Sequence, residues 1–102
     1  MNIQSLLKQA QKMQTEIAKA EKTLKERTYA TTVGGGVVNI ECNGACEVTK
    51  IEISETLLST DNKEMLEDMI QMAVNEVIGK SLAEKEEVMN SLTGGVKLPG
   101  VM

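Results

Sequence analysis

"VVNIECNGACEVTKIEI", residues 37–53, decides the fold of this chain. Its first half alternates apolar and polar residues, with Val38, Ile40 and Cys42 on one face, which is typical of a strand with one buried side. An Asn-Gly dipeptide follows directly, and this pair is the strongest short-range signal of a β-hairpin. The stretch therefore predicts two antiparallel strands joined by a tight turn.

The register of this hairpin depends on the length of its turn. A three-residue turn would place Cys42 opposite Cys46 and Ile40 opposite Val48. Further along the second strand the apolar residues change parity, so we expect a β-bulge near residues 49–50. We interpret the two cysteines as reduced strand residues, with a cross-strand disulfide or a redox role as the alternative.

A third strand is predicted upstream of the hairpin. Tyr29–Val33 is β-prone, and Gly34–Gly36 then interrupts it. A glycine-rich turn before a helix can hold a phosphate group, but these glycines lie between two predicted strands and no Lys-Ser or Lys-Thr pair follows. We therefore expect a flexible turn within a three-stranded antiparallel sheet over residues 28–54.

The first 26 residues have the pattern of a long helix with a narrow apolar seam. At a rise of 1.5 Å per residue, a helix over residues 2–26 is roughly 38 Å long, more than a compact domain of this size needs. A seam two positions in seven wide suits another helix better than a sheet, so we expect it to pack on helices of its own chain or of a partner. Seven residues at spacings of three and four form the seam: Ile3, Leu6, Ala10, Met13, Ile17, Ala20 and Leu24.

A second helix is predicted over residues 61–92, where Asp61 and Glu64 have the spacing of a capping box. Apolar residues fill two positions in each turn of its first half, so that face should lie on the sheet and on something else. Four methionines we interpret as packing groups of a core or an interface: Met65, Met69, Met72 and Met89. Three acidic residues we interpret as a solvated face: Glu84, Glu86 and Glu87.

These elements predict one α+β domain with the order helix, three strands, helix. Its parts are a helical arm over 2–27, the sheet over 28–54, the helix over 61–92 and a tail over 93–102. Hydrophobic residues make up 41% of the 102 residues, but only one is aromatic. The core must therefore be built from aliphatic side chains and methionine.

The composition excludes several classes of function. The chain has no histidine and two cysteines, which excludes His-containing triads and leaves too few ligands for a structural zinc site. We predict no enzymatic activity, no cofactor, no metal and no small-molecule substrate. No apolar run of about 18 residues is present, and the N-terminus lacks a signal-peptide pattern. We therefore expect no membrane association and a cytoplasmic location.

Charge is divided unevenly along the chain. Residues 1–27 carry six positive and three negative side chains, a net +3, whereas residues 28–102 carry five positive and twelve negative ones, a net −7. The overall charge of −4 argues against indiscriminate binding of nucleic acid. Any such contact should be local to the first helix.

With Ile3 at position a of a heptad, the lysines of the first helix lie away from its seam, at positions b, c and f. Four of them stack along one outer stripe: Lys8, Lys12, Lys19 and Lys22. Such a stripe suits a phosphate backbone, although outward lysines also serve simply as a solvated face. A single aromatic residue provides no stacking platform for single strands, and no recognition-helix turn is present. The candidate DNA-binding residues are Lys8, Lys12, Lys19, Lys22, Lys25 and Arg27, with Gln4, Gln9 and Gln11 as polar supplements.

The chain resembles the YbaB/EbfC family of bacterial nucleoid-associated proteins over nearly all of its length. The resemblance implies an α-β-β-β-α protomer in a tweezer-like homodimer, with the long helices as projecting arms. It also implies a cytoplasmic, nucleoid-associated protein that binds double-stranded DNA with little sequence preference and alters its conformation, without catalysis or cofactor. The hairpin cysteines depart from the family pattern. The similar segments are "LLKQAQKMQ" (6–14), "GGGVVNIECNGACEVTKIEI" (34–53), "DNKEMLEDMI" (61–70), "AVNEV" (73–77) and "LTGGVKLPG" (92–100).

We therefore predict a homodimer that binds duplex DNA in the nucleoid and influences gene expression. The alternative is a coiled-coil adaptor whose seam recruits another protein, with DNA binding weak or secondary. The lysine stripe favours the first prediction, whereas the seam and the acidic balance of the chain favour the second.

Overall fold

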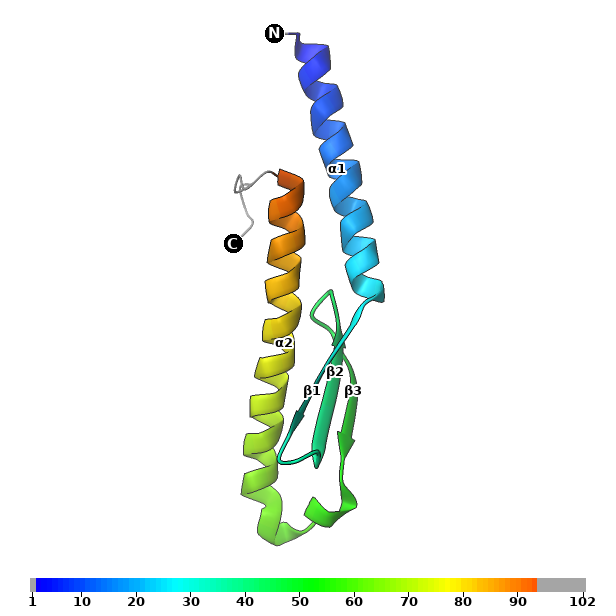
Figure 1. Cartoon of the computed structure of the whole chain (residues 1–102). Helices are drawn as coiled ribbons and strands as arrows, with labels where there is room; N and C mark the ends of the chain where they lie inside the picture. Colours follow the sequence, from blue (N-terminus) through cyan, green and yellow to red (C-terminus); the bar gives the residue numbers. More distant parts are fainter. Residues whose placement is uncertain (1, 94–102) are drawn as a thin grey trace.

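The computed structural model describes residues 2–93, which form a helix, three strands and a second helix (Figure 1). This order confirms the predicted α+β fold class. The molecule is elongated, with extents of 68 × 21 × 17 Å. Residues 94–102, which include nearly all of the predicted tail and most of the similar segment at 92–100, lie outside the described residues. The elements are α1 (Ile3–Glu26), β1 (Thr28–Val33), β2 (Val38–Asn43), β3 (Val48–Ile53), the 3₁₀ turns η1 (Glu55–Leu57) and η2 (Thr60–Asn62), and α2 (Lys63–Thr93).

α1 has a capped start and a definite end. The side chain of Asn2 accepts a hydrogen bond from the N–H of Gln4 at 3.0 Å, which satisfies one free donor of the first turn. The helix ends at Glu26, and Arg27 takes an extended backbone that leads directly into β1. With 24 residues, α1 is about 36 Å long. No loop separates this long helix from the sheet, so its base is tied to the position of β1.

The sheet is an antiparallel meander in the order β1-β2-β3. Glu41 of β2 pairs with Lys50 of β3, and the next residue, Cys42, pairs with Val48. Thr49 is therefore an extra residue on β3, which confirms the predicted bulge. The bulge restores the apolar residues of β3 to the side of the sheet that faces α2.

The pairing expected at the hairpin turn is wrong: the three-residue loop starts one residue later than expected, so Cys42 pairs with Val48, two residues beyond Cys46. Cys46 lies within the loop rather than opposite Cys42. The N–H of Asn43 donates to the carbonyl of Glu47 at 2.9 Å, so the loop comprises the three residues between them. The side chain of Asn43 explains the shift, because its Oδ1 accepts from the N–H groups of Ala45 and Glu47 at 2.9 and 3.1 Å. Asn43 thus organises the loop from the position before it.

The glycine run forms the turn between β1 and β2, as predicted. Gly34, Gly35 and Gly36 have φ angles of 64°, 73° and 99°, which side chains with a Cβ rarely adopt. Gly34 is also closely packed, because a Cβ there would lie 2.6 Å from Cγ2 of Val37 and 2.9 Å from Cε of Met69. The glycines therefore serve the geometry of a strand connection.

The hydrophobic core lies between α2 and one face of the sheet. Ala73 and Val77 of α2 are completely buried against β2, and Leu57 of η1 belongs to the same cluster. All of these are aliphatic, as the composition requires. The β2 residues of the core, each 0% exposed, are Val38, Ile40 and Cys42.

The start of α2 differs from the predicted capping box. Asp61 lies inside η2, and the helix begins at Lys63. Of the methionines near this end, Met69 packs against the core, whereas Met65 and Met72 are exposed. Neither helix within residues 2–93 has an apolar stretch long enough to cross a bilayer.

β3 lies at an edge of the sheet that α2 does not cover. Ile40 of β2 faces Ile51 rather than the expected Val48. Ile51 is 49% exposed and Val48 is 41% exposed, because α2 packs on β1 and β2. Within residues 2–93, Val48 and Ile51 of the third strand are thus left open, whereas Ile53 packs against the core.

Candidate nucleic-acid interface

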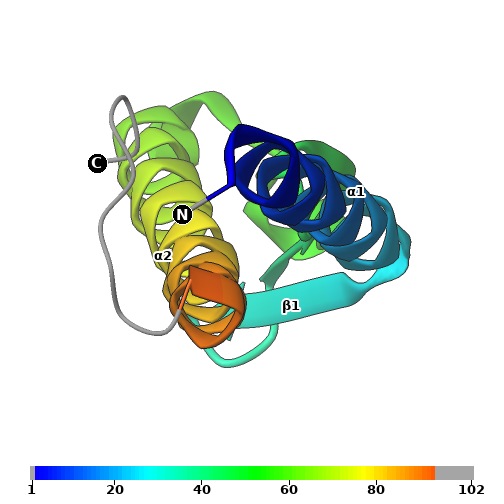
Figure 2. The same cartoon turned by 90° about the horizontal axis from the view of Figure 1, so that it is seen from above.

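α1 is an arm that projects from the body formed by the sheet and α2. The two helices run antiparallel, and the first turns of α1 extend past the end of α2 (Figure 1). Seen along the long axis, α1 and α2 stand side by side, with β1 running from the base of α1 toward α2 (Figure 2). Within residues 2–93, no other element therefore lies beside the first turns of the arm.

The apolar seam of α1 is buried only at its base. Leu24 is 2% exposed and packs where the arm meets the body, and Met13, Ile17 and Ala20 are half-buried. Leu24 meets the hairpin loop at Gly44, and α1 also contacts α2, so the base of the seam packs on its own chain. Toward the N-terminus the seam is exposed, together with a neighbouring leucine, and we call this segment the arm tip: Ile3, Leu6, Leu7 and Ala10.

Five candidate lysines lie along this arm, and all of them are exposed. Ion pairs among residues 2–93 involve only Arg27, Lys50, Lys63 and Lys80 as cations. No carboxylate of the described chain therefore lies within 4.0 Å of an arm lysine. Their positive charge is available to an external anion. The five are Lys8, Lys12, Lys19, Lys22 and Lys25.

The five lysines do not all share one line. At 100° per residue, Lys8, Lys12 and Lys19 fall within an arc of about 40°, on the side of α1 opposite the seam. Lys22 and Lys25 lie roughly 60° and 120° further round, because a 3.6-residue helix drifts against a seven-residue frame. The stripe is therefore straight over the first two thirds of the arm and turns toward the seam near its base.

Arg27 differs from the lysines. Its guanidinium forms an ion pair with Glu84 of α2, and its backbone N–H donates to the carbonyl of Leu24 at 3.0 Å. Glu84 is accordingly half-buried rather than part of a solvated face, whereas Glu86 and Glu87 are exposed. The pair joins the base of the arm to α2. A DNA contact by Arg27 stays a prediction, and it requires a phosphate to replace Glu84.

The hairpin loop also holds the base of the arm. The N–H of Gly44 donates to the carbonyl of Leu24 at 2.8 Å, and Gly44 is itself buried. On the other side of the loop, the hydroxyl of Ser81 in α2 donates to the carbonyl of Asn43 at 2.9 Å. Neither contact was predicted from the sequence, in which Gly44 served only as part of the Asn-Gly turn signal. A serine within the apolar face of α2 was the available signal, since a buried hydroxyl needs a partner.

The two cysteines surround the same serine. Sγ of Cys46 lies 3.4 Å from Oγ of Ser81, and Sγ of Cys42 lies 3.5 Å from the carbonyl oxygen of Val77. Both cysteines are free thiols. Burial is the main reason that the pKa of Cys42 is raised, with Cys46 nearby adding to the effect and a hydrogen bond with Ser81 opposing it. The pair is therefore poorly suited to supply a reactive thiolate from Cys42.

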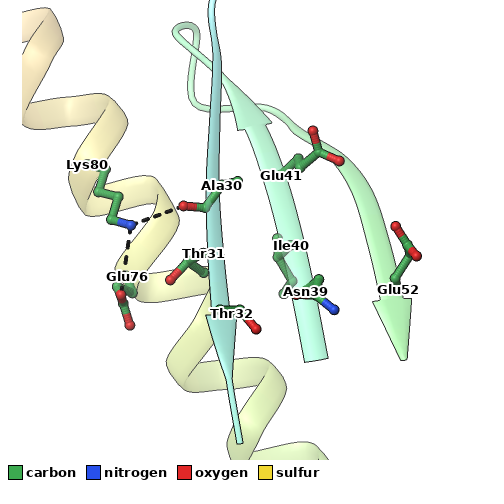
Figure 3. A pocket seen from close by; sticks show the side chains of 9 residues that line it. All are labelled: Ala30, Thr31, Thr32, Asn39, Ile40, Glu41, Glu52, Glu76 and Lys80. Carbon is green, nitrogen blue, oxygen red and sulfur yellow. Dashed lines mark hydrogen bonds and ion pairs between the residues drawn. The ribbon is translucent and has the colours of Figure 1, made fainter. Parts of the chain in front are cut away.

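A shallow hollow of about 490 Å³ lies on the body, beside β1 and β2 (Figure 3). Three carboxylates line it, from Glu41, Glu52 and Glu76, and each is ion-paired, the first two with Lys50 at 3.8 and 2.8 Å and Glu76 with Lys80 at 4.0 Å. That lysine is engaged, since its Nζ donates to the carbonyl of Ala30 at 3.0 Å. Three carboxylates against two engaged ammonium groups leave the hollow slightly negative, so an anionic polymer should meet the arm and not this part of the body.

Residues 2–93 contain no cluster of three or more acidic or cysteine side chains placed to hold a metal ion. Within residues 2–93, the arm presents a row of cations without ion-pair partners, and the body that carries the arm is acidic. The model of the YbaB/EbfC DNA-binding family matches residues 1–96. The chain belongs to this family. Its members are DNA-binding proteins and not a known class of enzymes.

Several relatives of this YbaB/EbfC chain are named nucleoid-associated proteins. One from Anaeromyxobacter dehalogenans is 39% identical over 101 residues, which cover 99% of this chain and 98% of the relative. Another from Pelotomaculum thermopropionicum is 40% identical over 100 residues, covering 98% and 95%. The crystal structure of an uncharacterized protein from Helicobacter pylori matches with a TM-score of 0.86 over 92% of this chain and 99% of that one. At 22% identity, that likeness supports the YbaB/EbfC fold alone.

Proposed function

We propose that this protein binds double-stranded DNA in the bacterial nucleoid as a homodimer, with little sequence preference, and alters the conformation of the DNA. The contacts are made by Lys8, Lys12, Lys19, Lys22 and Lys25, supplemented by Arg27 and by the glutamines at positions 4, 9 and 11. Through the altered DNA the protein influences gene expression. It acts in the cytoplasm, where the nucleoid lies.

The exposed lysines of α1 carry this proposal. No carboxylate within residues 2–93 pairs with them, although the body of the chain offers many. Lys8 and Lys19 are eleven residues apart, so the straight part of the stripe spans roughly 16 Å. This length matches a short run of phosphates along one strand, because phosphates recur every few ångströms along a duplex.

The chain lacks the exposed aromatic side chains on which single-stranded bases stack, so duplex DNA is the favoured ligand. Tyr29, the sole aromatic residue, is half-buried in β1 and cannot stack on a base. Low sequence preference follows from the side chains of the arm, since lysine contacts to phosphate carry no base information. A straight helix without a second helix beside its start also differs from a helix-turn-helix reader.

A homodimer is supported by apolar surface that one chain leaves open. Val48 and Ile51 lie on the core side of the sheet but beyond α2, and both are more than two-fifths exposed. Leu82 of α2 is also 48% exposed. A second copy packed here would bury these residues and would present two arms to one duplex. Two arms on one DNA segment provide both avidity and a means to bend it.

A salt titration tests the proposal. We expect the logarithm of the duplex affinity to fall linearly with the logarithm of salt concentration, with a slope of about −0.9 for each phosphate neutralised. Duplexes of unrelated sequence should give nearly the same affinity. An affinity that does not change between low and physiological salt would overturn the role of the lysine stripe.

The exposed arm tip favours a second candidate, a coiled-coil adaptor that recruits another protein through its seam. Ile3 is 74% exposed and Leu7 is 56% exposed, which is unusual for aliphatic residues of a helix that serves only to carry lysines. Pull-downs from lysates with and without nuclease treatment separate the two functions. Partners that persist after nuclease treatment support the adaptor.

A further inference from the structure

The arm tip is an apolar surface that the lysine stripe does not use. Ile3, Leu6 and Leu7 are 74%, 46% and 56% exposed, and α2 ends before it reaches them. Leu7 lies outside the a/d seam, at position e, so the seam pattern alone does not account for it. A partner for this surface must therefore contact both the seam and its e edge.

The heptad pattern indicates what kind of partner fits. Alternating spacings of three and four present the narrow seam that accepts another helix by knobs-into-holes packing. Around the tip, the flanking e and g positions are Leu7, Gln9 and Gln14, none of which is charged. The tip therefore has no charged residues beside its seam that would select a different protein. Its apolar pattern fits the same surface of a second copy of the chain.

Charge and shape decide the orientation of two paired tips. Parallel pairing would bring Glu16 at g against Glu21 at e of the second copy, which places two carboxylates together. It would also bring both bodies to the same end. Antiparallel pairing avoids both conflicts, sets Leu6 of one copy beside Ala10 of the other, and brings the two Leu7 side chains to one edge.

Residues 1–14 contain two lysines and no acidic residue. Two tips therefore repel each other in free solution, and this repulsion disappears when phosphates neutralise Lys8 and Lys12. The tip offers about one and a half heptads, far less than the three to four of an independent coiled coil. Pairing should accordingly be weak unless DNA holds the arms at high effective concentration.

We propose that arm tips of neighbouring dimers pair antiparallel on DNA and make binding cooperative. This inference rests on the proposed function, because DNA supplies both charge neutralisation and proximity. Lys8 and Lys12 lie at f and c, so they stay on the outer side of the paired helices. The two arms then present one continuous row of cations, and successive dimers are linked along the duplex.

Binding to two lengths of duplex tests the pairing. One duplex is shortened until it holds a single dimer, and the other is long enough for many. The variant with Leu6→Gln and Leu7→Gln should keep its affinity for the short duplex, but should lose cooperativity and about tenfold in apparent affinity on the long one. The control Ala18→Gln, on the exposed side of the same arm, should change neither value.

The outcomes separate this inference from the function on which it rests. Unchanged cooperativity in the leucine variant overturns the pairing, as does an equal loss of affinity on both duplexes, which would mean that the tip contacts DNA directly. Failure of the unmodified protein to bind the short duplex overturns DNA binding by the arm, and the pairing with it.

Cross-linking tests the orientation. In a Cys46→Ser background, Leu6→Cys and Ala10→Cys are made separately and mixed on long DNA with a short bismaleimide. Antiparallel tips should give mostly mixed cross-links between position 6 of one copy and position 10 of the other, and few without DNA. Cross-links formed only between like positions would overturn the antiparallel arrangement.

Discussion

The amide N–H of Gly44 donates to the carbonyl oxygen of Leu24 at 2.8 Å, and a Cβ built on Gly44 would lie 2.1 Å from that oxygen. The hairpin loop therefore meets the last turn of α1 backbone against backbone. Only glycine permits this approach. The contact supplies a donor to a carbonyl at the helix end and fixes where the arm leaves the body.

Gly44→Ala should therefore displace the arm. We expect the free energy of unfolding to fall by about 2–4 kcal/mol, from overpacking and a lost hydrogen bond. Duplex affinity should fall as well, because the lysine stripe is carried on the displaced helix. Urea unfolding and fluorescence anisotropy with labelled duplex measure the two effects.

Gly79→Ala provides the matched control. Gly79 lies in α2, and a Cβ there would meet no atom within 4 Å other than its chain neighbours and the backbone of its own helix. Alanine is the better helix former, so this variant should be unchanged or up to about 1 kcal/mol more stable. Equal destabilisation of the two variants would contradict the special role of the loop contact.

Reversing charge in the middle of the stripe should abolish duplex binding. Lys12→Glu with Lys19→Glu replaces two exposed, unpaired cations that lie on the same line of α1. The helix should remain folded, because glutamate is also a good helix former. Mobility shift on duplex DNA measures binding, while circular dichroism and light scattering measure fold and assembly.

Lys63→Glu with Lys85→Glu makes the same change in net charge on α2 and serves as the control. Affinity should then fall only slightly, through the long-range field of the molecule. If both double variants lose binding equally, net charge and not the position of the stripe governs the interaction.

The ion pair between Arg27 and Glu84 makes a separate prediction. Glu84→Gln releases the guanidinium, so duplex affinity should rise and the salt slope should steepen by up to about 0.9, the value for one further phosphate. Stability should fall by no more than about 1 kcal/mol, since the side chains are 46% and 34% exposed. A salt titration of both proteins measures the slope. An unchanged slope would remove Arg27 from the candidate contacts.

Local patterns were sufficient to predict the elements of this fold. Strand alternation, the Asn-Gly pair and the apolar spacing of α1 each depend on residues close in sequence, which is why the order of elements is confirmed. The pairing at the turn failed because the side chain of Asn43 captured two backbone N–H groups. Such a competition between side chain and turn is not visible in a hydrophobic pattern.

The candidate interface was less predictable than the fold. Helical periodicity is enough to group Lys8, Lys12 and Lys19 on one side of α1. The contacts that hold the arm are different, because they join residues distant in sequence, Leu24 to Gly44 and Arg27 to Glu84. Such pairs depend on tertiary packing, so no spacing of residues along the sequence predicts them.

The thiols should differ in reactivity and in their effect on stability. Because burial raises the pKa of Cys42 above its ordinary value of 9.0, Cys46 should be alkylated first at pH 8. Because the pKa of Cys42 is higher in the folded than in the unfolded protein, folding favours the neutral thiol. The resulting stability is fully present below pH 9.0 and is lost as the pH rises through the pKa of the folded protein. Unfolding free energy should thus fall more steeply above pH 9 in the unmodified protein than in Cys42→Ala. Lys50, whose pKa is raised by Glu52 and Glu41, titrates in both proteins.

Ile51→Lys should separate the proposed dimer into folded monomers. Ile51 is half-exposed on the apolar side of β3, so lysine costs little within one chain but places a charge in a buried interface between two. Light scattering should report the mass of one chain, and duplex affinity should fall because one arm binds without the avidity of two. Glu52→Lys is the control, since it introduces the same side chain on the polar face of the strand. A dimer that persists in Ile51→Lys would mean that the subunits meet through another surface.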